Sequence, residues 1–456
     1  MENTCKDILI IGGGPAGYLA AERAAAGGLS VTLFEERALG GVCLNEGCMP
    51  TKTLLHSAKI YDYARNGMAY GVSAGHVRFD HNAVIDRKEK VVKTLVSGVA
   101  AKMRAGKIEV VQSTAAITGR KDGVFSVRTK TNTYHGRHLL IATGSAPIVP
   151  QIGGMKEGLE AGYILTSREI LDMRDVPDKL AVIGGGVVGL EMAAYFATAG
   201  SKVSVIEMAD KIGGYIDHEI SAVLMKDLEK KGIEFHLGCR VTGISKQSLT
   251  YEKDGVTTLI ETETVLAAIG RSPRIANIGL ETIGIHIERG GIVTDKHLRT
   301  NIPGCYAIGD VNGKSMLAHT AYREAEVAVN HILGKRDNMR YDAIPSVIYT
   351  SPEVAAVGET EESATAKKLE FTVKKLSMLY SGRFVAENES GDGLCKLLVE
   401  KNTNRLIGAH LIGSYASEII YGAAMMIESR WPVTDLQELV FPHPTVSEII
   451  RETLWS

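Results

Sequence analysis

Two cysteines, Cys43 and Cys48, lie in a glycine-rich stretch shortly after the first strand–helix–strand segment of the chain. On an ideal helix, positions five apart point roughly 140° away from each other, so a disulfide between them requires a distorted helix start. Gly41, Gly47 and Pro50 are residue types that permit such a distortion. The pair is therefore interpreted as redox-active rather than as a structural crosslink.

Two less favoured interpretations of this pair are ordinary buried cysteines and a zinc site. Zinc spacing would require a second pair of ligands, which the sequence does not offer, so no metal site is expected. The other four cysteines are isolated in the sequence, and for them we favour the role of small core residues. These are Cys5, Cys239, Cys305 and Cys395.

The bulk composition is that of a globular protein with two to four domains. The chain has 456 residues, of which 45% are hydrophobic and 23% charged, and its net charge is -2. This charge predicts neither a nucleic-acid partner nor a membrane-surface partner, and the sequence has no apolar run long enough for a membrane span. The first strand is expected from about Lys6, which leaves no room for a targeting peptide, and six cysteines do not make a secreted disulfide scaffold. We expect a cytoplasmic protein.

A repeated glycine motif indicates the elements that must position the cysteines. A short apolar strand at 6–11 is followed by Gly12–Gly17, and another at 179–183 is followed by Gly184–Gly189. Both stretches satisfy GxGxxG, directly after a strand and directly before an alanine-rich helix. Such glycines let the backbone approach a diphosphate at a helix N-terminus, so the repeat predicts two dinucleotide sites.

A glutamate ends the next strand in each copy and strengthens this prediction. Glu35 follows Gly12 at the same distance as Glu207 follows Gly184. A carboxylate in this position binds a pair of ribose hydroxyls. The alternative is that both motifs are tight strand–helix turns that bind no ligand. We do not favour it, because such a turn would have to occur twice with the same spacing. Glu207 is followed by no arginine that could hold a 2′-phosphate, which favours NAD over NADP at the second site.

Three further apolar strands end in glycine, as if the chain returned to these sites. They occur at 139–147, 264–273 and 304–310. Asp310, at the end of the third, could reach a cofactor hydroxyl, although a solvated turn aspartate is the simpler alternative.

These patterns predict an α/β fold with two Rossmann-like dinucleotide-binding domains plus a C-terminal α+β domain. The expected boundaries are 1–148 for the first domain, 149–270 for the second, 271–343 for a segment that returns to the first, and 344–456 for the C-terminal domain.

The two glycine motifs, the cysteine pair and the C-terminal stretch Phe441–Glu448 together resemble the flavin-dependent pyridine nucleotide-disulfide oxidoreductases. The resemblance covers essentially the whole chain and is closest to the class I members that oxidise dihydrolipoamide. It implies FAD on the first unit, completed by 271–343, NAD on the second, and a homodimer built by the C-terminal domain. The cysteine segment differs from the family's commonest sequence at four positions, Val42, Glu46, Met49 and Thr51. None of these differences removes a group that the chemistry needs.

The resemblance also implies roles for individual residues. Cys48 is expected nearer the flavin, as the charge-transfer thiol, and Cys43 is expected to attack the substrate. Lys52 and Glu191 resemble the ion pair that this family places beside the flavin N5. The sequence around Glu191 is an apolar helix start, where a carboxylate needs a partner, although an acid favoured by the helix dipole is the alternative.

His443 lies between two prolines, and Glu448 follows five residues later. A structural turn would explain the Pro-His-Pro sequence, whereas Glu448 could orient the imidazole as base-orienting pairs require. The resemblance makes His443 the acid/base that serves the thiols of the other subunit.

The cofactor contacts that we expect fall into two sets. Those for FAD are Gly12, Gly14, Pro15, Ala16, Gly17, Glu35, Lys52, Ala115, Thr143, Gly144, Ser145, Asp310 and Ala318. Those for NAD are Gly184, Gly186, Val187, Val188, Gly189, Glu207, Val241, Ala268, Gly270 and Arg271.

The activity implied is oxidation of protein-bound dihydrolipoamide, as the E3 component of 2-oxo acid dehydrogenase or glycine cleavage complexes. The lipoyl carrier would be a separate acyltransferase or H-protein chain. Related alternatives are a glutathione or mercuric reductase. The first usually prefers NADP, and the second would carry a terminal cysteine pair that Arg451–Ser456 lacks. The second cysteine disfavours a single-thiol oxidase or peroxidase. The complete set of reactive residues disfavours a non-catalytic flavoprotein scaffold.

Overall fold

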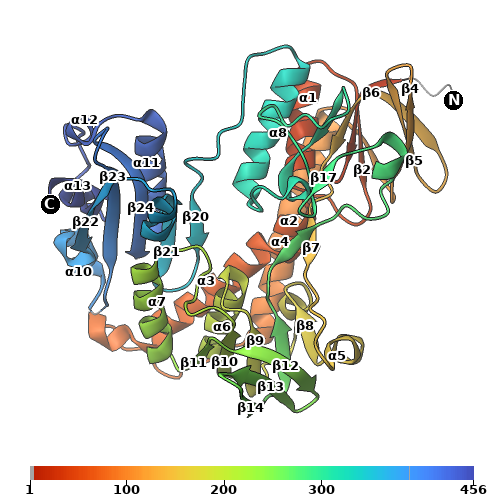
Figure 1. Ribbon diagram of the computed structural model, residues 1–456. Coiled ribbons are helices and arrows are strands. Elements are labelled where there is room, and N and C mark those ends of the chain that lie inside the picture. The colour runs from red at the N-terminus through yellow and green to blue at the C-terminus, as the bar shows by residue number, and fades with distance from the viewer. Residues whose placement is uncertain (1–4, 390) are drawn as a thin grey trace. The chain divides into compact units, whose positions relative to one another are not determined.

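The computed structural model describes residues 5–389 and 391–456. The chain forms two compact units, which are considered separately here and are labelled by element in Figure 1. The first unit contains the chain up to Thr51, Asp86–Ile148 and Gly270–Arg340, and the second contains Lys52–Ile85, Val149–Ile269 and the chain from Tyr341. The divisions at Thr51 and at Ile85 fall inside the long helices α3 (Cys48–Arg65) and α4 (His81–Ala105).

The first unit is built on a seven-stranded sheet with β1 at its centre. The parallel strands are β1 (Lys6–Ile11), β2 (Val31–Glu35), β3 (Glu109–Gln112), β6 (Thr133–Ile141) and β19 (Cys305–Ala307). The antiparallel strands are β4 (Ala116–Lys121) and β5 (Val124–Arg128). Leu9, Leu33 and Leu139 are fully buried in neighbouring strands, as near-continuous apolar strands of a covered parallel sheet require.

Helices α1 (Pro15–Ala26) and α8 (Ala318–Ile332) pack side by side in this unit (Figure 1). Pro15 occupies the first turn of α1, where its missing N–H costs nothing. Buried alanines on both helices, including Ala20, Ala24 and Ala325, allow the close approach. The N-terminal ends of the two helices lie near each other, because Tyr18 of α1 and Tyr322 of α8 are in hydrogen-bond contact.

A short helix carries Cys43 between β2 and the long helix α3. Helix α2 (Gly41–Glu46) ends at Gly47, whose φ of -151° and ψ of -109° are not helical, and α3 begins directly after it at Cys48. The two cysteines thus lie on separate helical segments. A single regular helix would have directed them apart.

The second unit contains a five-stranded parallel sheet that repeats the first motif. Its strands are β8 (Ile164–Thr166), β9 (Lys179–Ile183), β10 (Lys202–Glu207), β11 (Ile233–Leu237) and β15 (Thr264–Ala267). Helix α6 (Val187–Ala199) follows β9, and α7 (His218–Lys230) follows β10. A three-stranded antiparallel sheet, β12 (Arg240–Ser245), β13 (Ser248–Lys253) and β14 (Val256–Glu261), lies between β11 and β15 in the chain.

The C-terminal part of this unit is a five-stranded antiparallel sheet with helices. The strands are β20 (Ser346–Ile348), β21 (Glu353–Gly358), β22 (Phe371–Ser377), β23 (Leu394–Glu400) and β24 (Arg405–Gly413). The helices are α9 (Glu361–Ala366), α10 (Gly382–Glu387), α11 (Ala416–Ser429), α12 (Val433–Leu436) and α13 (Glu448–Trp455). The predicted fold class, two Rossmann-like domains plus an α+β domain, is confirmed.

Shorter elements complete the described chain. They are α5 (Met155–Ala161), β7 (Ser145–Pro147), β16 (Arg271–Pro273), β17 (Ile287–Glu288), β18 (Gly291–Ile292) and the 3-10 helices η1 (Gly67–Tyr70), η2 (Glu169–Asp172), η3 (Leu280–Ile283), η4 (Gly309–Asn312) and η5 (Met378–Tyr380). Among the described residues, no helix combines the length and the apolarity that crossing a membrane would need.

Candidate active site

The first glycine motif forms a turn that only glycine can make. Gly12 has a φ of +109°, and a Cβ there would lie 2.2 Å from the carbonyl oxygen of Ala142 on the returning strand. A Cβ on Gly17 would lie 1.8 Å from the carbonyl oxygen of Gly12. By contrast, the nearest atom to a Cβ on Gly14 would be 3.8 Å away. The turn therefore leaves space at Gly14 beside the N-terminus of α1, which fits a diphosphate.

The second motif has the same geometry. Gly184 has a φ of +103°, and a Cβ there would lie 2.6 Å from the carbonyl oxygen of Ala268. A Cβ on Gly189 would lie 2.1 Å from the carbonyl oxygen of Gly184, whereas a Cβ on Gly186 would meet nothing within 4 Å. Each cradle can thus accept one dinucleotide, with the helix N-terminus favouring its negative charge.

The two glutamates at the ends of β2 and β10 are held in matching positions. Glu35 Oε2 accepts a hydrogen bond of 2.7 Å from the N–H of Gly13, and Glu207 Oε2 accepts one of 2.6 Å from the N–H of Gly185. The second oxygen of each carboxylate accepts a further backbone N–H, from Arg37 and from Ala209 respectively. Both carboxylates are therefore fixed beside their glycine turns and half-buried, as ribose-binding acids should be.

The returning strands bring Ser145, Arg271 and Asp310 together within the first unit. Ser145 Oγ donates to Asp310 Oδ2 at 2.5 Å, and Arg271 Nε donates to Ser145 Oγ at 2.8 Å. Burial raises the pKa of Asp310 above its usual value, while Ser145 and Arg271 act in the opposite direction. Arg271, which the sequence predicts among the NAD contacts, belongs to the first unit, and its cofactor contact stays a prediction.

A buried glutamate that the sequence did not single out fixes the turn before Asp310. Glu324 is fully buried in α8, and its Oε2 accepts hydrogen bonds from the N–H of Gly309, at 2.6 Å, and from Asn312 Nδ2, at 2.9 Å. Gly309 has a φ of +75°, a backbone conformation that residues with a Cβ atom rarely adopt. In the sequence, a glutamate on an amphipathic helix is expected to face solvent. No local pattern therefore identified Glu324 as a buried residue.

The start of α2 lies directly against the first glycine cradle. A Cβ on Gly41 would be 2.6 Å from the Cα of Gly14, so only glycine allows this approach. Cys43 follows two residues later, and both Cys43 and Cys48 are half-buried. The cysteine pair is thus held close to the position of a bound diphosphate and is not sealed from reactants.

Lys52 and Glu191 form an ion pair within the second unit. Lys52 Nζ lies 3.0 and 2.9 Å from the two oxygens of Glu191, whose side chain is 3% exposed. Tyr349, which the sequence did not single out, contacts both partners. Its backbone N–H donates to Glu191 Oε1 at 2.9 Å, and its ring centroid lies 4.4 Å from Lys52 Nζ. The carboxylate therefore has the partner that its apolar helix required.

His443 and Glu448 form a second paired site in the C-terminal part of this unit. His443 Nδ1 and Glu448 Oε1 are 2.9 Å apart, and Glu448 Oε2 accepts the N–H of Thr445 at 2.9 Å. The Thr445 N–H and then His443 hold the pKa of Glu448 below its usual value. The His443 side chain is 79% exposed, so its other nitrogen can exchange protons with a reactant.

The remaining predicted contacts distribute between the two units. Pro15, Ala16, Ala115, Thr143, Gly144 and Ala318 lie in the first unit. Val187, Val188, Val241 and Ala268 lie in the second, whereas Gly270, expected at the NAD site, begins the last segment of the first. Val187 and Val188 are more than a third exposed at the start of α6. Their side chains are therefore accessible beside the second cradle.

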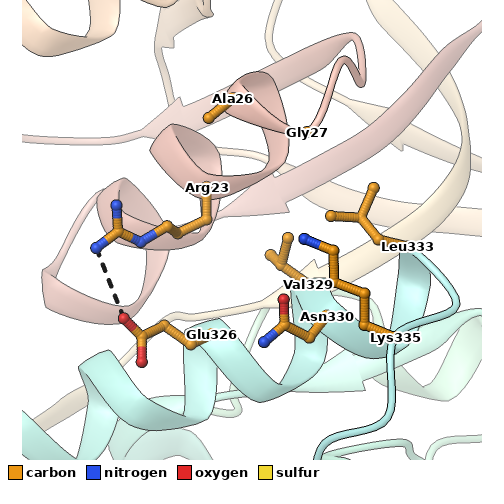
Figure 2. A pocket seen from close by; sticks show the side chains of 8 residues that line it. All are labelled: Arg23, Ala26, Gly27, Glu326, Val329, Asn330, Leu333 and Lys335. Atoms are coloured by element: carbon orange, nitrogen blue, oxygen red, sulfur yellow. Dashed lines mark ion pairs between the residues drawn. The ribbon is translucent and has the colours of Figure 1, made fainter.

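A surface hollow of about 260 Å³ lies elsewhere, at the C-terminal ends of α1 and α8 (Figure 2). Arg23 and Glu326, 3.6 Å apart, form its polar rim. It contains none of the predicted site residues. Within the described ranges, no group of three or more His, Cys, Asp or Glu side chains could hold a metal ion.

Comparisons with known proteins agree with this arrangement. Residues 6–325 match the pyridine nucleotide-disulphide oxidoreductase model, and residues 344–454 match the dimerisation domain of the same group. The chain is 36% identical to a dihydrolipoyl dehydrogenase from Mycoplasma pneumoniae over 98% of this chain and 97% of that protein. It is also 36% identical to the mitochondrial dihydrolipoyl dehydrogenase of Pisum sativum, over 98% of this chain and 90% of that protein.

A solved structure extends the comparison to three dimensions. The HOCl-induced flavoprotein disulfide reductase RclA from Escherichia coli is 27% identical and superposes with a TM-score of 0.86, covering 98% of this chain and 99% of that one.

Proposed function

Since the chain belongs to the pyridine nucleotide-disulphide oxidoreductase family, we propose that it oxidises dihydrolipoamide carried on a separate lipoyl-bearing chain and passes the electrons to NAD. The carrier would be an acyltransferase or an H-protein, with this protein as the E3 component of a 2-oxo acid dehydrogenase or glycine cleavage complex. The observation that carries the proposal is the cysteine pair, which is divided by a helix break at Gly47 and lies in a segment that packs through Gly41 against the dinucleotide cradle at Gly14.

The cofactors are FAD and NAD, and two glycine cradles with matching glutamates fit them. FAD, when bound, carries two electrons between the thiols and NAD. The dithiol substrate loses two electrons and two protons as its sulfurs join in a disulfide. NAD takes up the two electrons and one proton, and the second proton is released.

Each reactive residue then has a task that its surroundings support. Cys43 would attack the substrate, and Cys48 would face the flavin when it is bound. His443, oriented by Glu448, accepts protons from the thiols. Lys52, paired with Glu191 and held beside the ring of Tyr349, would supply positive charge to a bound flavin.

The dimerisation domain at 344–454 supports a homodimer. We further propose that the thiols of one subunit work with His443 of the other. The domain boundaries in this scheme remain 1–148, 149–270, 271–343 and 344–456. We assign the protein to the cytoplasm, a reducing compartment in which its cysteine content is ordinary.

The thiols provide the first test. Cys43→Ser should retain FAD and lose lipoamide turnover, because the substrate-facing nucleophile is removed. Cys48→Ser should lose turnover and also the long-wavelength thiolate–flavin absorbance. Cys239→Ser, which changes a buried cysteine in the second unit, is the matched control and should remain active. Substantial lipoamide turnover in either active-site variant would refute the disulfide mechanism.

A direct assay separates this function from its nearest rival. Initial rates of NAD reduction with dihydrolipoamide should far exceed those of NADPH oxidation with glutathione disulfide. The Glu207 carboxylate should repel a 2′-phosphate, so kcat/KM should favour NAD over NADP. A preference for NADP together with glutathione disulfide would overturn both assignments.

A further inference from the structure

Two tyrosine hydroxyls meet at the N-terminal ends of α1 and α8. Tyr18 Oη and Tyr322 Oη are 2.5 Å apart, and their rings lie edge to face with centroids 6.0 Å apart. Tyr18 is 7% exposed and Tyr322 is half-buried. The two residues are 304 positions apart in the sequence, and neither belongs to the glycine motif or to the cysteine segment.

The helix geometry places this pair on the side of α1 that contacts the cysteine segment. Tyr18 lies one turn after Gly14, and its N–H donates to the Gly14 carbonyl at 2.9 Å, so both residues lie on one face of the helix. Gly14 is the residue against which Gly41 packs, and Cys43 follows two residues later in the same short helix α2. Within the first unit, Tyr18 and its partner Tyr322 therefore lie on the side of α1 against which the cysteine segment packs through Gly41.

The electrostatic environment agrees with this placement. Burial, the partner hydroxyl and the nearby Cys43 and Cys48 all raise the pKa of Tyr18. Burial and the two cysteines also raise the pKa of Tyr322, against the effect of the Tyr18 hydroxyl. Both phenols therefore stay protonated and can act as hydrogen-bond donors throughout the neutral range.

We propose that the Tyr18–Tyr322 hydroxyl pair donates a hydrogen bond to the thiolate that forms when the Cys43–Cys48 redox pair is reduced. Two hydroxyls carry two hydrogens, and the bond between them uses one. In the described part of the chain neither hydroxyl has another hydrogen-bond partner, so the second hydrogen can be directed at a sulfur. The proposal rests on the redox role of the two cysteines given above.

The expected consequence is a more acidic thiol. A hydrogen bond donated to a charged group typically contributes about 1.5 kcal/mol, which corresponds to roughly tenfold in a proton-binding equilibrium. Because one hydroxyl polarises the other, the pair should act as a unit. Loss of the terminal donor should then have the full effect, loss of its partner a smaller effect, and loss of both no more than the larger single loss.

The test measures alkylation of the holoenzyme by iodoacetamide after anaerobic reduction with dithiothreitol, as a function of pH. In whichever of Tyr18→Phe and Tyr322→Phe removes the terminal donor, the rate below the thiol pKa should fall about tenfold, with the profile displaced to higher pH, and the other variant should show a smaller fall in the same direction. The thiolate–flavin absorbance should titrate at correspondingly higher pH. Mass spectrometry identifies which cysteine reacts.

Tyr306→Phe is the matched control, because it also removes a buried tyrosine hydroxyl in the first unit. Tyr306 is 3% exposed, and its hydroxyl bonds to His331 Nδ1 at 2.9 Å. Its profile should equal that of the wild type. Wild-type profiles in both Tyr18→Phe and Tyr322→Phe, or an equal loss in Tyr306→Phe, would overturn the proposal.

The readout needs neither lipoamide nor NAD. A wild-type protein with the expected alkylation profile but no dihydrolipoamide turnover would therefore refute the proposed substrate alone. Normal turnover combined with unchanged profiles in the variants would refute the hydroxyl pair alone.

Discussion

At the scale of single residues, the carboxylates of the candidate site share one mode of attachment. In each of them one oxygen accepts a hydrogen bond from a backbone N–H, and the carboxylate also accepts a hydrogen bond from a second donor. The plane of the carboxylate therefore cannot rotate freely. The four, with their donors, are Glu35 (Gly13 and Arg37 N–H), Glu191 (Tyr349 N–H and Lys52), Glu207 (Gly185 and Ala209 N–H) and Glu448 (Thr445 N–H and His443). Donors that are already in place reduce the reorganisation needed when a ligand binds.

Glu191→Gln should weaken the fold by about 1–2 kcal/mol. The amide can still accept the N–H of Tyr349, but Lys52 loses its charged partner, and the loss is moderated because the Lys52 side chain is 28% exposed. Urea unfolding measures the change. The control is Glu160→Gln, which breaks an exposed pair with Lys156 at 3.9 Å and should leave the unfolding midpoint unchanged. Equal midpoints for both variants would show that the buried pair contributes nothing.

At the scale of elements, buried charges join helix α7 to strand β23. Lys396 on β23 is 2% exposed, and its Nζ lies 2.9 Å from Oδ1 of Asp217, which is 1% exposed. Asp217 also caps α7 by accepting the N–H of Glu219. Burial by itself raises the pKa of Asp217, but its bonds to Lys396 outweigh burial and hold that pKa below its usual value.

Lys396→Met should destabilise the protein by about 3 kcal/mol at pH 7, because Asp217 is left buried without a counter-ion. The sign of the pH dependence follows from the lowered pKa of Asp217. Its contribution in the wild type is present above the unfolded pKa of about 3.9 and is lost as the pH falls through the lower folded value. The difference between the variant and the wild type should therefore shrink in acid.

Urea unfolding at pH 7 and at about pH 3 measures this difference. The control is Lys226→Met, which removes an exposed lysine from α7, the helix that Asp217 caps. Lys226 is paired with Asp392 at 3.3 Å, and its replacement should change the stability little at either pH. A loss for Lys396→Met that stays constant with pH would show that Asp217 is not the group involved.

At the scale of the whole molecule, the reactive groups come from distant parts of the chain. Cys43 lies in the short helix α2 and Cys48 begins the long helix α3, whereas His443 lies near the C-terminus in the region matched by the dimerisation model. In the proposed homodimer each site takes its thiols from one subunit and its histidine from the other, as isologous assembly allows.

Mixed dimers test this arrangement. Homodimers of Cys48→Ser and of His443→Ala should both be nearly inactive. Co-refolding of equal amounts should produce heterodimers in about half of the molecules, each with one restored site, so activity should recover to about a quarter of the wild type. If heterodimers form and nothing is restored, His443 serves its own chain or no substrate.

The sequence by itself determined the parts of this protein that depend on local backbone geometry. GxGxxG between a strand and a helix, and a glutamate at the end of the next strand, require particular dihedral angles and short-range contacts, so they could be recognised without the fold. Fold class followed from the order of these patterns. Gly41 and Gly47 likewise indicated that the helix carrying the cysteines would be distorted.

Only the tertiary structure decided which distant side chains meet. Tyr18 pairs with Tyr322, Asp217 with Lys396, and Tyr349 with Glu191, across separations of 304, 179 and 158 residues. It also placed Arg271 beside Ser145, in the first unit. Such contacts depend on how helices and strands pack, and a single sequence carries no local signal for that packing, because the same residue types in the same pattern could equally face solvent.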